Sequence, residues 1–127
     1  MDELPARMKA VGTAQQAGDV LKIAEANRSL IAAALRAMAE LKLAQGDTRQ
    51  SIELYRRSLE LENTPDSHVA LALAYMRAQR TDEALAEIAP IKANPRNADA
   101  WNVQGKLLMD KKEYRQAAES LTRSLEL

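Results

Sequence analysis

The chain offers few side chains that could perform catalysis or hold a metal ion. It contains one histidine, His68, and no cysteine, which leaves it without a thiolate nucleophile, a disulfide or a cysteine metal ligand. The sequence suggests no serine or cysteine partner for His68, and one histidine without partners is a weak signal of catalysis, so a packed structural role is favoured. Acidic residues such as Glu53 and Glu60 fall at helical positions typical of a solvated face. We therefore expect no enzyme activity, no catalytic residue, no cofactor and no metal.

The basic residues lack the clustering that nucleic-acid binding requires. The 127 residues include 18 Lys and Arg against 18 Asp and Glu. The pairs Arg56–Arg57 and Lys111–Lys112 are each flanked by acidic residues, which favours a solvated surface. A repeat protein that reads RNA would need a basic concave face, and none is indicated. We expect no nucleic-acid partner.

The elements that position these residues are predicted to be helices. Good helix formers are abundant, phenylalanine is absent and aromatic residues make up 3% of the chain. No apolar run approaches the roughly 20 residues that span a membrane, and residues 1–11 lack the apolar core of a signal peptide. We expect an all-α protein of the cytoplasm that does not enter a membrane, unless an upstream signal segment was removed.

Residue types recur at a constant offset of 33 residues, which indicates an internal repeat. Small residues that would let two helices approach closely occupy two of the recurring positions, and bulky residues that would fill the next gap occupy a third. The three series are Ala39, Ala72 and Gly105; Ser51, Ala84 and Ala117; and Tyr55, Ile88 and Leu121. One helix pair cannot bury its apolar faces alone, so successive pairs are expected to stack.

These series resemble the tetratricopeptide repeat, whose pattern begins W-x2-L-G-x2-Y and continues with A-x3-F. The three repeats read Trp101-x2-Gln104-Gly105-x2-Leu108, His68-x2-Leu71-Ala72-x2-Tyr75 and Leu35-x2-Met38-Ala39-x2-Lys42. Gln104, Lys42 and Ser51 depart from the pattern. The resemblance implies a right-handed superhelix of antiparallel helix pairs, an α-solenoid. We expect a single domain, with a degenerate pair over 1–31 and repeats over 32–64, 65–97 and 98–127, the last without a capping helix.

The helices are predicted over 3–17, 19–28, 30–45, 48–62, 66–79, 81–93, 98–111 and 113–127. Gly18 and Gly46 suit a residue with positive φ just past a helix end. Pro90 should kink or end its helix near Ala89. A break over 27–29 is the preferred interpretation of the N-terminal quarter. The alternative is one long helix from Val20 to Ala44, because no glycine or proline interrupts it.

In the family that the chain resembles, the first helix of each repeat lines a concave groove that binds a partner. The matching positions here are Arg36, Glu40, Leu43, Val69, Leu73, Met76, Arg77, Asn102, Lys106 and Met109, together with Ala33, Ala44, Asp66, Asp99 and Asp110. The Lys and Asn clamp that some members use for carboxylates is matched only by Asn102 and Lys106. We therefore expect a protein partner that presents an apolar or amphipathic peptide segment.

Helical spacing supports part of this groove independently. Val69, Leu73 and Met76 follow an i, i+4, i+7 stripe, and Leu71 and Tyr75 form a second stripe on the same helix. A helix that is apolar on two faces is buried on one and contacts something else on the other. The alternative is that both stripes belong to the core of a tightly stacked solenoid.

The last predicted helix carries an apolar stripe of its own. Leu121, Leu125 and Leu127 continue that stripe, and no further helix follows to cover it. Either the chain belongs to a longer repeat array or another chain covers this end. Self-assembly into a homo-oligomer through the last helix is therefore the alternative function to the groove.

Overall fold

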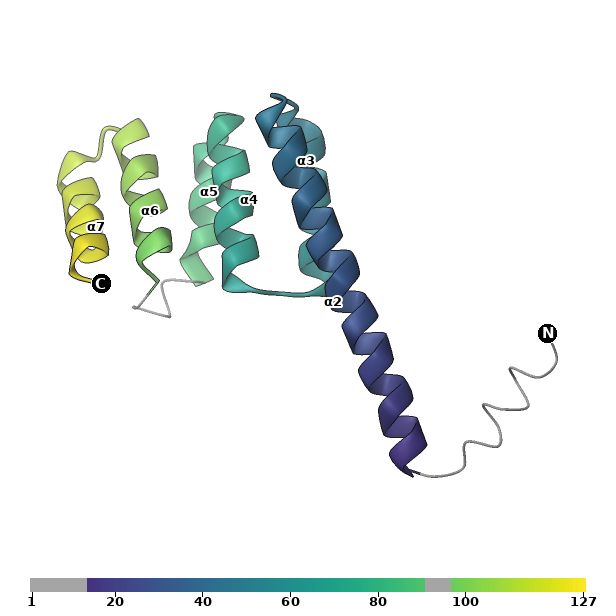
Figure 1. Cartoon of the computed structure of the whole chain (residues 1–127). Coiled ribbons are helices and arrows are strands. Elements are labelled where there is room, and N and C mark those ends of the chain that lie inside the picture. The colour runs from purple at the N-terminus through teal and green to yellow at the C-terminus, as the bar shows by residue number, and fades with distance from the viewer. Residues whose placement is uncertain (1–13, 91–96) are drawn as a thin grey trace.

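The structure is a computed structural model that describes residues 14–90 and 97–127, and every helix and turn below lies in those ranges (Figure 1). Its regular elements are all α-helices. They are α2 (Ala14–Ala44), α3 (Thr48–Leu61), α4 (Pro65–Arg77), α5 (Thr81–Ile88), α6 (Ala98–Asp110) and α7 (Tyr114–Glu126). The prediction of an all-α fold is confirmed.

The helices form three antiparallel pairs that stack in chain order. α2 packs on α3, α4 on α5 and α6 on α7, while α3 meets α4, and α6 meets both α5 and α4 (Figure 1). Each pair therefore shares its core with the next one, as a solenoid requires. The helices α3, α4, α5 and α6 all contribute large, fully buried side chains to this core. These are Tyr55, Leu71, Tyr75, Ile88 and Leu107.

The small residues of the repeat lie where paired helices approach most closely. Ala39, Ala72, Ala84 and Ala117 are completely buried. At Gly105 a Cβ atom would come within 2.5 Å of the Leu121 Cγ, so the bulky residue of α7 occupies the space that the glycine leaves. The small residues that recur every 33 residues are therefore the ones buried between helices.

Two buried serines of α3 donate hydrogen bonds from their hydroxyls to carbonyl oxygens of the partner helix α2. Ser51 stands where the next two repeats have alanine, and its Oγ donates to the Ala39 carbonyl oxygen at 2.8 Å. Ser58 donates to the Ala32 carbonyl in the same way, also at 2.8 Å. A buried hydroxyl without such an acceptor would cost free energy, so these bonds allow serine at close contacts.

The turn within each helix pair has the same geometry in all three pairs of the described structure. Gly46, Gln79 and Lys112 each adopt a positive φ, of 84°, 61° and 62°. The N–H of the following residue then reaches back to a carbonyl in the last turn of the preceding helix, as from Asp47 to Lys42 at 2.9 Å. This pattern is a Schellman motif, which closes the first helix and fixes the angle at which the second one leaves. The prediction for Gly46 is confirmed.

The N-terminal quarter differs from the preferred prediction. Residues 14–44 form one helix of 31 residues, so the predicted break over 27–29 is wrong and the alternative of a continuous helix is confirmed. Gly18 lies inside α2 and makes no turn. Ser29 does not begin a new helix; its hydroxyl donates to the Glu62 carboxylate just beyond α3. Of the predicted helix over 3–17, residues 3–13 lie outside the described residues and residues 14–17 belong to α2.

Two helix boundaries lie next to proline residues, at the end of α5 and at the start of α4. α5 ends at Ile88 with Ala89 as its C-cap, which confirms the effect of Pro90 and shortens the helix predicted over 81–93. α4 begins with Pro65 at its first position, and the Thr64 side chain accepts a hydrogen bond from the Ser67 N–H. The division of the chain into a degenerate pair and three repeats stays a prediction.

Candidate functional site

The hollow that best matches the predicted groove lies between α2 and α4. It encloses about 310 Å³ and is lined by Glu40, Leu43, Ala44, Tyr55, Ala70, Leu73 and Arg77. Five of these residues were predicted as groove positions, namely Glu40, Leu43, Ala44, Leu73 and Arg77. The helices α2 and α4 supply six of the seven lining residues, and α3 supplies Tyr55. We call this set of seven residues the α2–α4 hollow.

The hollow has an apolar floor and one charge of each sign. Leu43, Ala70 and Leu73 are partly exposed and pack against the hydrophobic core. Glu40 and Arg77 are exposed. Such a site can take up an apolar side chain while its two charges contact polar groups of the same ligand.

Tyr55 is the lining residue that the groove pattern did not identify. Its ring is buried in the core. Burial, and after it the negative charge of Glu40, raises the pKa of Tyr55 to about 12, while Arg36 and Arg77 act in the opposite direction. The phenol stays neutral over the physiological range. The signal was present in the sequence, because the equivalent Ile88 and Leu121 have no hydroxyl.

The other predicted groove residues of the first two repeats lie elsewhere. Val69 is only 8% exposed and belongs to the hydrophobic core, so its placement as an accessible groove residue is wrong. Met76 is half-buried against the same core. The Arg36 guanidinium Nη1 donates to the Ser67 hydroxyl at 3.3 Å and ties α2 to α4. The core alternative thus holds for Val69, whereas Leu73 of the same stripe reaches the hollow.

The residues predicted from the third repeat do not line the α2–α4 hollow. Asn102 is half-buried on α6, while Lys106 and Met109 are exposed. The groove that sequence reasoning extended over three repeats is thus represented by a hollow between the first two.

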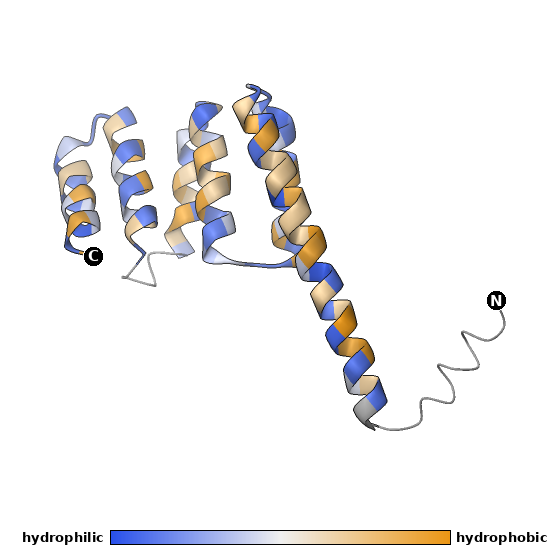
Figure 2. Ribbon diagram, in the orientation of Figure 1, coloured by the Kyte–Doolittle hydropathy of each residue, from blue (hydrophilic) through white to orange (hydrophobic). Residues whose placement is uncertain are grey.

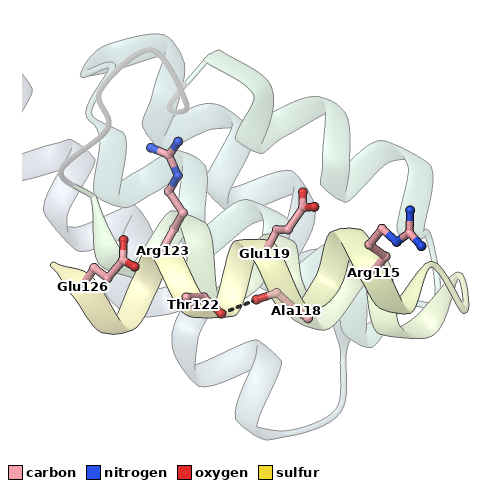
Figure 3. Close-up of a pocket in the computed structure, with 6 residues that line it drawn as sticks. All are labelled: Arg115, Ala118, Glu119, Thr122, Arg123 and Glu126. Carbon is pink, nitrogen blue, oxygen red and sulfur yellow. Dashed lines mark hydrogen bonds between the residues drawn. The ribbon is translucent and has the colours of Figure 1, made fainter.

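The surface of α7 is mostly polar. An open depression of about 520 Å³ on this helix is lined by Arg115, Ala118, Glu119, Thr122, Arg123 and Glu126, four of which are charged (Figure 3). Leu121 is half-buried against Gly105, so it is not part of a free stripe. Leu125 and Leu127 are exposed, Leu125 at 88%. Of the three residues predicted for an oligomer contact, only these two are accessible.

A second polar hollow of about 360 Å³ lies where α6 meets α7. Its lining residues are Trp101, Gln104, Gln116, Glu119, Ser120 and Arg123. The Arg123 guanidinium lies over the Trp101 ring, 5.4 Å from its centroid. Gln104 stands where the family pattern has leucine, and its buried Oε1 atom has no hydrogen-bond partner. This hollow does not have the apolar floor of the one between α2 and α4.

His68 has a structural environment. Its Nδ1 lies 2.9 Å from a Glu87 carboxylate oxygen, and its Nε2 lies 2.7 Å from the Asn63 amide oxygen. The ring therefore joins α4 to α5 and to the preceding loop. In the described ranges no group of three or more His, Cys, Asp and Glu side chains is arranged to hold a metal ion. No helix within those ranges is long and apolar enough to cross a membrane.

Two family models match the sequence, and both are described as tetratricopeptide repeat. One matches residues 42–107 and the other residues 98–127. A comparison with curated protein sequences gives no match.

Several solved structures resemble this fold. The first tetratricopeptide domain of human RPAP3 aligns with a TM-score of 0.72 and 19% identity, over 77% of this chain and 79% of that one. The Sgt2 domain from Aspergillus fumigatus gives 0.71 and 21%, over 75% and 64%. The second such domain of Spaghetti (RPAP3), bound to the HSP90 peptide SRMEEVD, gives 0.73 and 19%, over 82% and 97%. At these identities the likeness establishes the fold.

Proposed function

Because the chain belongs to the tetratricopeptide repeat family, we propose that it is an interaction scaffold that binds an apolar or amphipathic peptide segment in the α2–α4 hollow. The observation that carries this proposal is the apolar floor of Leu43, Ala70 and Leu73 between two exposed charges. A helix or turn of the partner would place one apolar side chain on this floor and its polar groups at the rim.

The charges of the hollow decide which class of peptide it favours. A strongly acidic peptide, such as the one bound to Spaghetti, needs several uncompensated cations to hold it. Here Arg77 is the one cation of the lining, which also contains the anion Glu40, and the Arg36 guanidinium, outside the lining, donates a hydrogen bond to the Ser67 hydroxyl. The Asn102 and Lys106 pair lies on α6, outside the lining set. An apolar anchor therefore suits the α2–α4 hollow better than a carboxylate-rich tail.

The proposal is tested by filling the hollow without damaging the core. Ala44 is exposed and lines the hollow, so Ala44→Trp would occupy it while the buried residues stay in place. Peptides selected by the wild-type protein from a phage-displayed random library should carry Leu, Ile, Met or Phe at helical spacing. Their affinity for Ala44→Trp, measured by calorimetry, should fall at least about tenfold, which corresponds to about 1.4 kcal/mol.

The matched control is Ala86→Trp, because Ala86 is an exposed alanine on α5, outside the hollow. This variant should bind the selected peptides as the wild-type protein does. Selection of acidic C-terminal sequences would contradict the apolar anchor. Equal affinities of the two variants for the selected peptides would place the binding surface elsewhere.

A further inference from the structure

The helix α2 exposes an apolar stripe, interrupted by Asn27, that nothing in the described structure covers. The stripe contains six large side chains between 45% and 67% exposed, namely Val20, Ile23, Leu30, Ile31, Met38 and Leu41. The intervals between them are three, seven, one, seven and three residues, which at 3.6 residues per turn places all six on one side of the helix. Figure 2 shows hydrophobic residues recurring along α2, including the part that projects beyond α3. We call these six residues the α2 stripe.

The α2 stripe points away from the rest of the molecule. Ala32 and Ala39 lie on the other side of α2, are buried, and accept hydrogen bonds from Ser58 and Ser51 of α3. A second molecule could therefore approach the stripe without meeting the solenoid behind it.

The repeat itself shows what kind of element covers this face. Met38 and Leu41 of α2 correspond, at the offset of 33, to Leu71 and Ala74 of α4 and to Gln104 and Leu107 of α6. All four of the later residues are buried, whereas Met38 and Leu41 are exposed. α4 packs on α3, and α6 packs on α5 as well as on α4. The short connection between α3 and α4 makes these two helices antiparallel (Figure 1). The same face of α2 is thus suited to receive an antiparallel helix.

The other end of the chain does not supply that helix. A head-to-tail contact would set the α2 stripe, which extends over 22 residues, against the 13 residues of α7. α7 exposes Tyr114 and Leu125, but beside them an open depression is lined by Arg115, Glu119, Arg123 and Glu126 (Figure 3). Placing four charged side chains on an apolar stripe would cost desolvation without pairing them. α2 of a second copy presents no such charges along its own stripe.

We propose that two copies of this chain associate through their α2 stripes, packed antiparallel about a two-fold axis. With the axis between Leu30 and Ile31, Val20 lies opposite Leu41 of the second copy and Ile23 lies opposite its Met38. Every large residue of the α2 stripe then meets another one, as an isologous interface requires. The central Asn27 meets the small Ala34, which leaves room for its amide to reach the edge of the interface.

The size of the stripe suits a stable dimer. Val20 to Leu41 covers 22 residues, or about 33 Å of helix. Interfaces of standard size take about 800 Å² from each partner, and six large, half-exposed side chains with the alanines between them supply an area of that order. The arrangement also covers the N-terminal half of α2, which α3 does not reach.

Sedimentation equilibrium of the full chain over a range of concentrations tests the dimer. The wild-type protein should associate to twice its mass of 14.0 kDa and no further, because a two-fold contact closes on itself. Leu30→Asp should weaken association about 100-fold or more, because it places two carboxylates at the axis. Leu30 is 67% exposed in the single chain, so this variant should keep its helicity by circular dichroism.

The control for this test is Leu125→Asp, which changes an 88% exposed leucine on α7 and should leave the dimer intact. A monomer at high concentration would overturn the proposal. So would a dimer that Leu30→Asp leaves unchanged, or one that Leu125→Asp abolishes, since both results would place the contact elsewhere. Met38→Asp repeats the test at a second exposed position.

Cysteine cross-linking tests the antiparallel arrangement, because the natural chain has no cysteine. A mixture of Val20→Cys and Leu41→Cys chains should form a disulfide between the two variants. Val20→Cys alone should form none, because its two sulfurs would lie about 30 Å apart along the helices. Efficient cross-linking of Val20→Cys to itself would indicate a parallel pair and would contradict the arrangement.

Discussion

Gly105 of α6 lies in close contact with Leu121 of α7. A Cβ atom there would meet the branched Cγ of Leu121 at 2.5 Å and Cδ2 at 2.6 Å. Gly105→Ala gains about 1 kcal/mol of helix propensity but costs about 1–3 kcal/mol through overpacking. We expect the free energy of unfolding, measured with urea, to fall by about 1 kcal/mol.

A double-mutant cycle separates these two effects. In a Leu121→Ala background the Cγ and Cδ atoms are absent, so Gly105→Ala should become stabilising through its helix propensity alone. If Gly105→Ala had the same effect in both backgrounds, contact with Leu121 would not be the reason for glycine at this position.

Tyr55 makes stability depend on pH in the alkaline range. Its pKa is about 12 in the folded chain against 10.0 for a free phenol, so the folded state holds the proton more tightly. The contribution of the protonated Tyr55 phenol to the free energy of unfolding is fully present below pH 10 and is lost as pH rises through 12. Between these values, urea unfolding should show a steeper loss of stability for the wild-type protein than for Tyr55→Phe. Parallel pH profiles of the two proteins would contradict this prediction.

At the scale of the element, the three turns within the repeats use one backbone conformation with different residues. Gly46 adopts the positive φ without strain, whereas Gln79 and Lys112 adopt it with a Cβ atom. For residues other than glycine this region costs about 1–2 kcal/mol, and glycine loses about 0.5–1 kcal/mol of chain entropy on folding. Lys112→Gly should therefore stabilise the protein by about 0.5–1 kcal/mol in thermal or urea unfolding.

The matched control for the turn is Lys106→Gly, since Lys106 is exposed inside α6. The same exchange should there cost about 1 kcal/mol, because glycine is a poor residue in a helix interior. Loss of stability in both variants would show that the positive φ at Lys112 carries no strain.

α2 shows how a local signal can mislead at this scale. Ser29 is a good N-cap residue, and Gly18–Asp19 resembles the Gly46–Asp47 turn. Neither feature is strong enough to end a helix whose neighbours are alanine, leucine and lysine, because one glycine costs only about 1 kcal/mol. The contact from Ser29 to Glu62 gives that hydroxyl a partner outside α2.

At the scale of the whole molecule, α2 contributes to two different surfaces. Glu40, Leu43 and Ala44 line the α2–α4 hollow, while the α2 stripe faces away from α3. The proposed peptide site and the proposed dimer contact therefore lie on different sides of one helix. A dimer built in this way would carry two peptide sites, one on each copy, and its avidity for a partner with two segments would exceed that of a single site.

The sequence by itself determined the helical class, the helix pairs and the close contacts within each pair. Those features depend on residue size and on spacing along the chain, such as Ala84 four residues before Ile88, which local geometry converts into neighbours. The resemblance to the tetratricopeptide repeat also implied five residues of the α2–α4 hollow, because they match the groove positions of that family.

Only the tertiary structure decided how accessible each face is. Val69 and Leu73 belong to one stripe, but the neighbouring helices bury the first and leave part of the second open. Met38 and Leu71 occupy equivalent positions, yet only Leu71 has a preceding helix to cover it within the described structure. Burial depends on which elements meet across the stack, and the periodicity of a single helix does not contain that information.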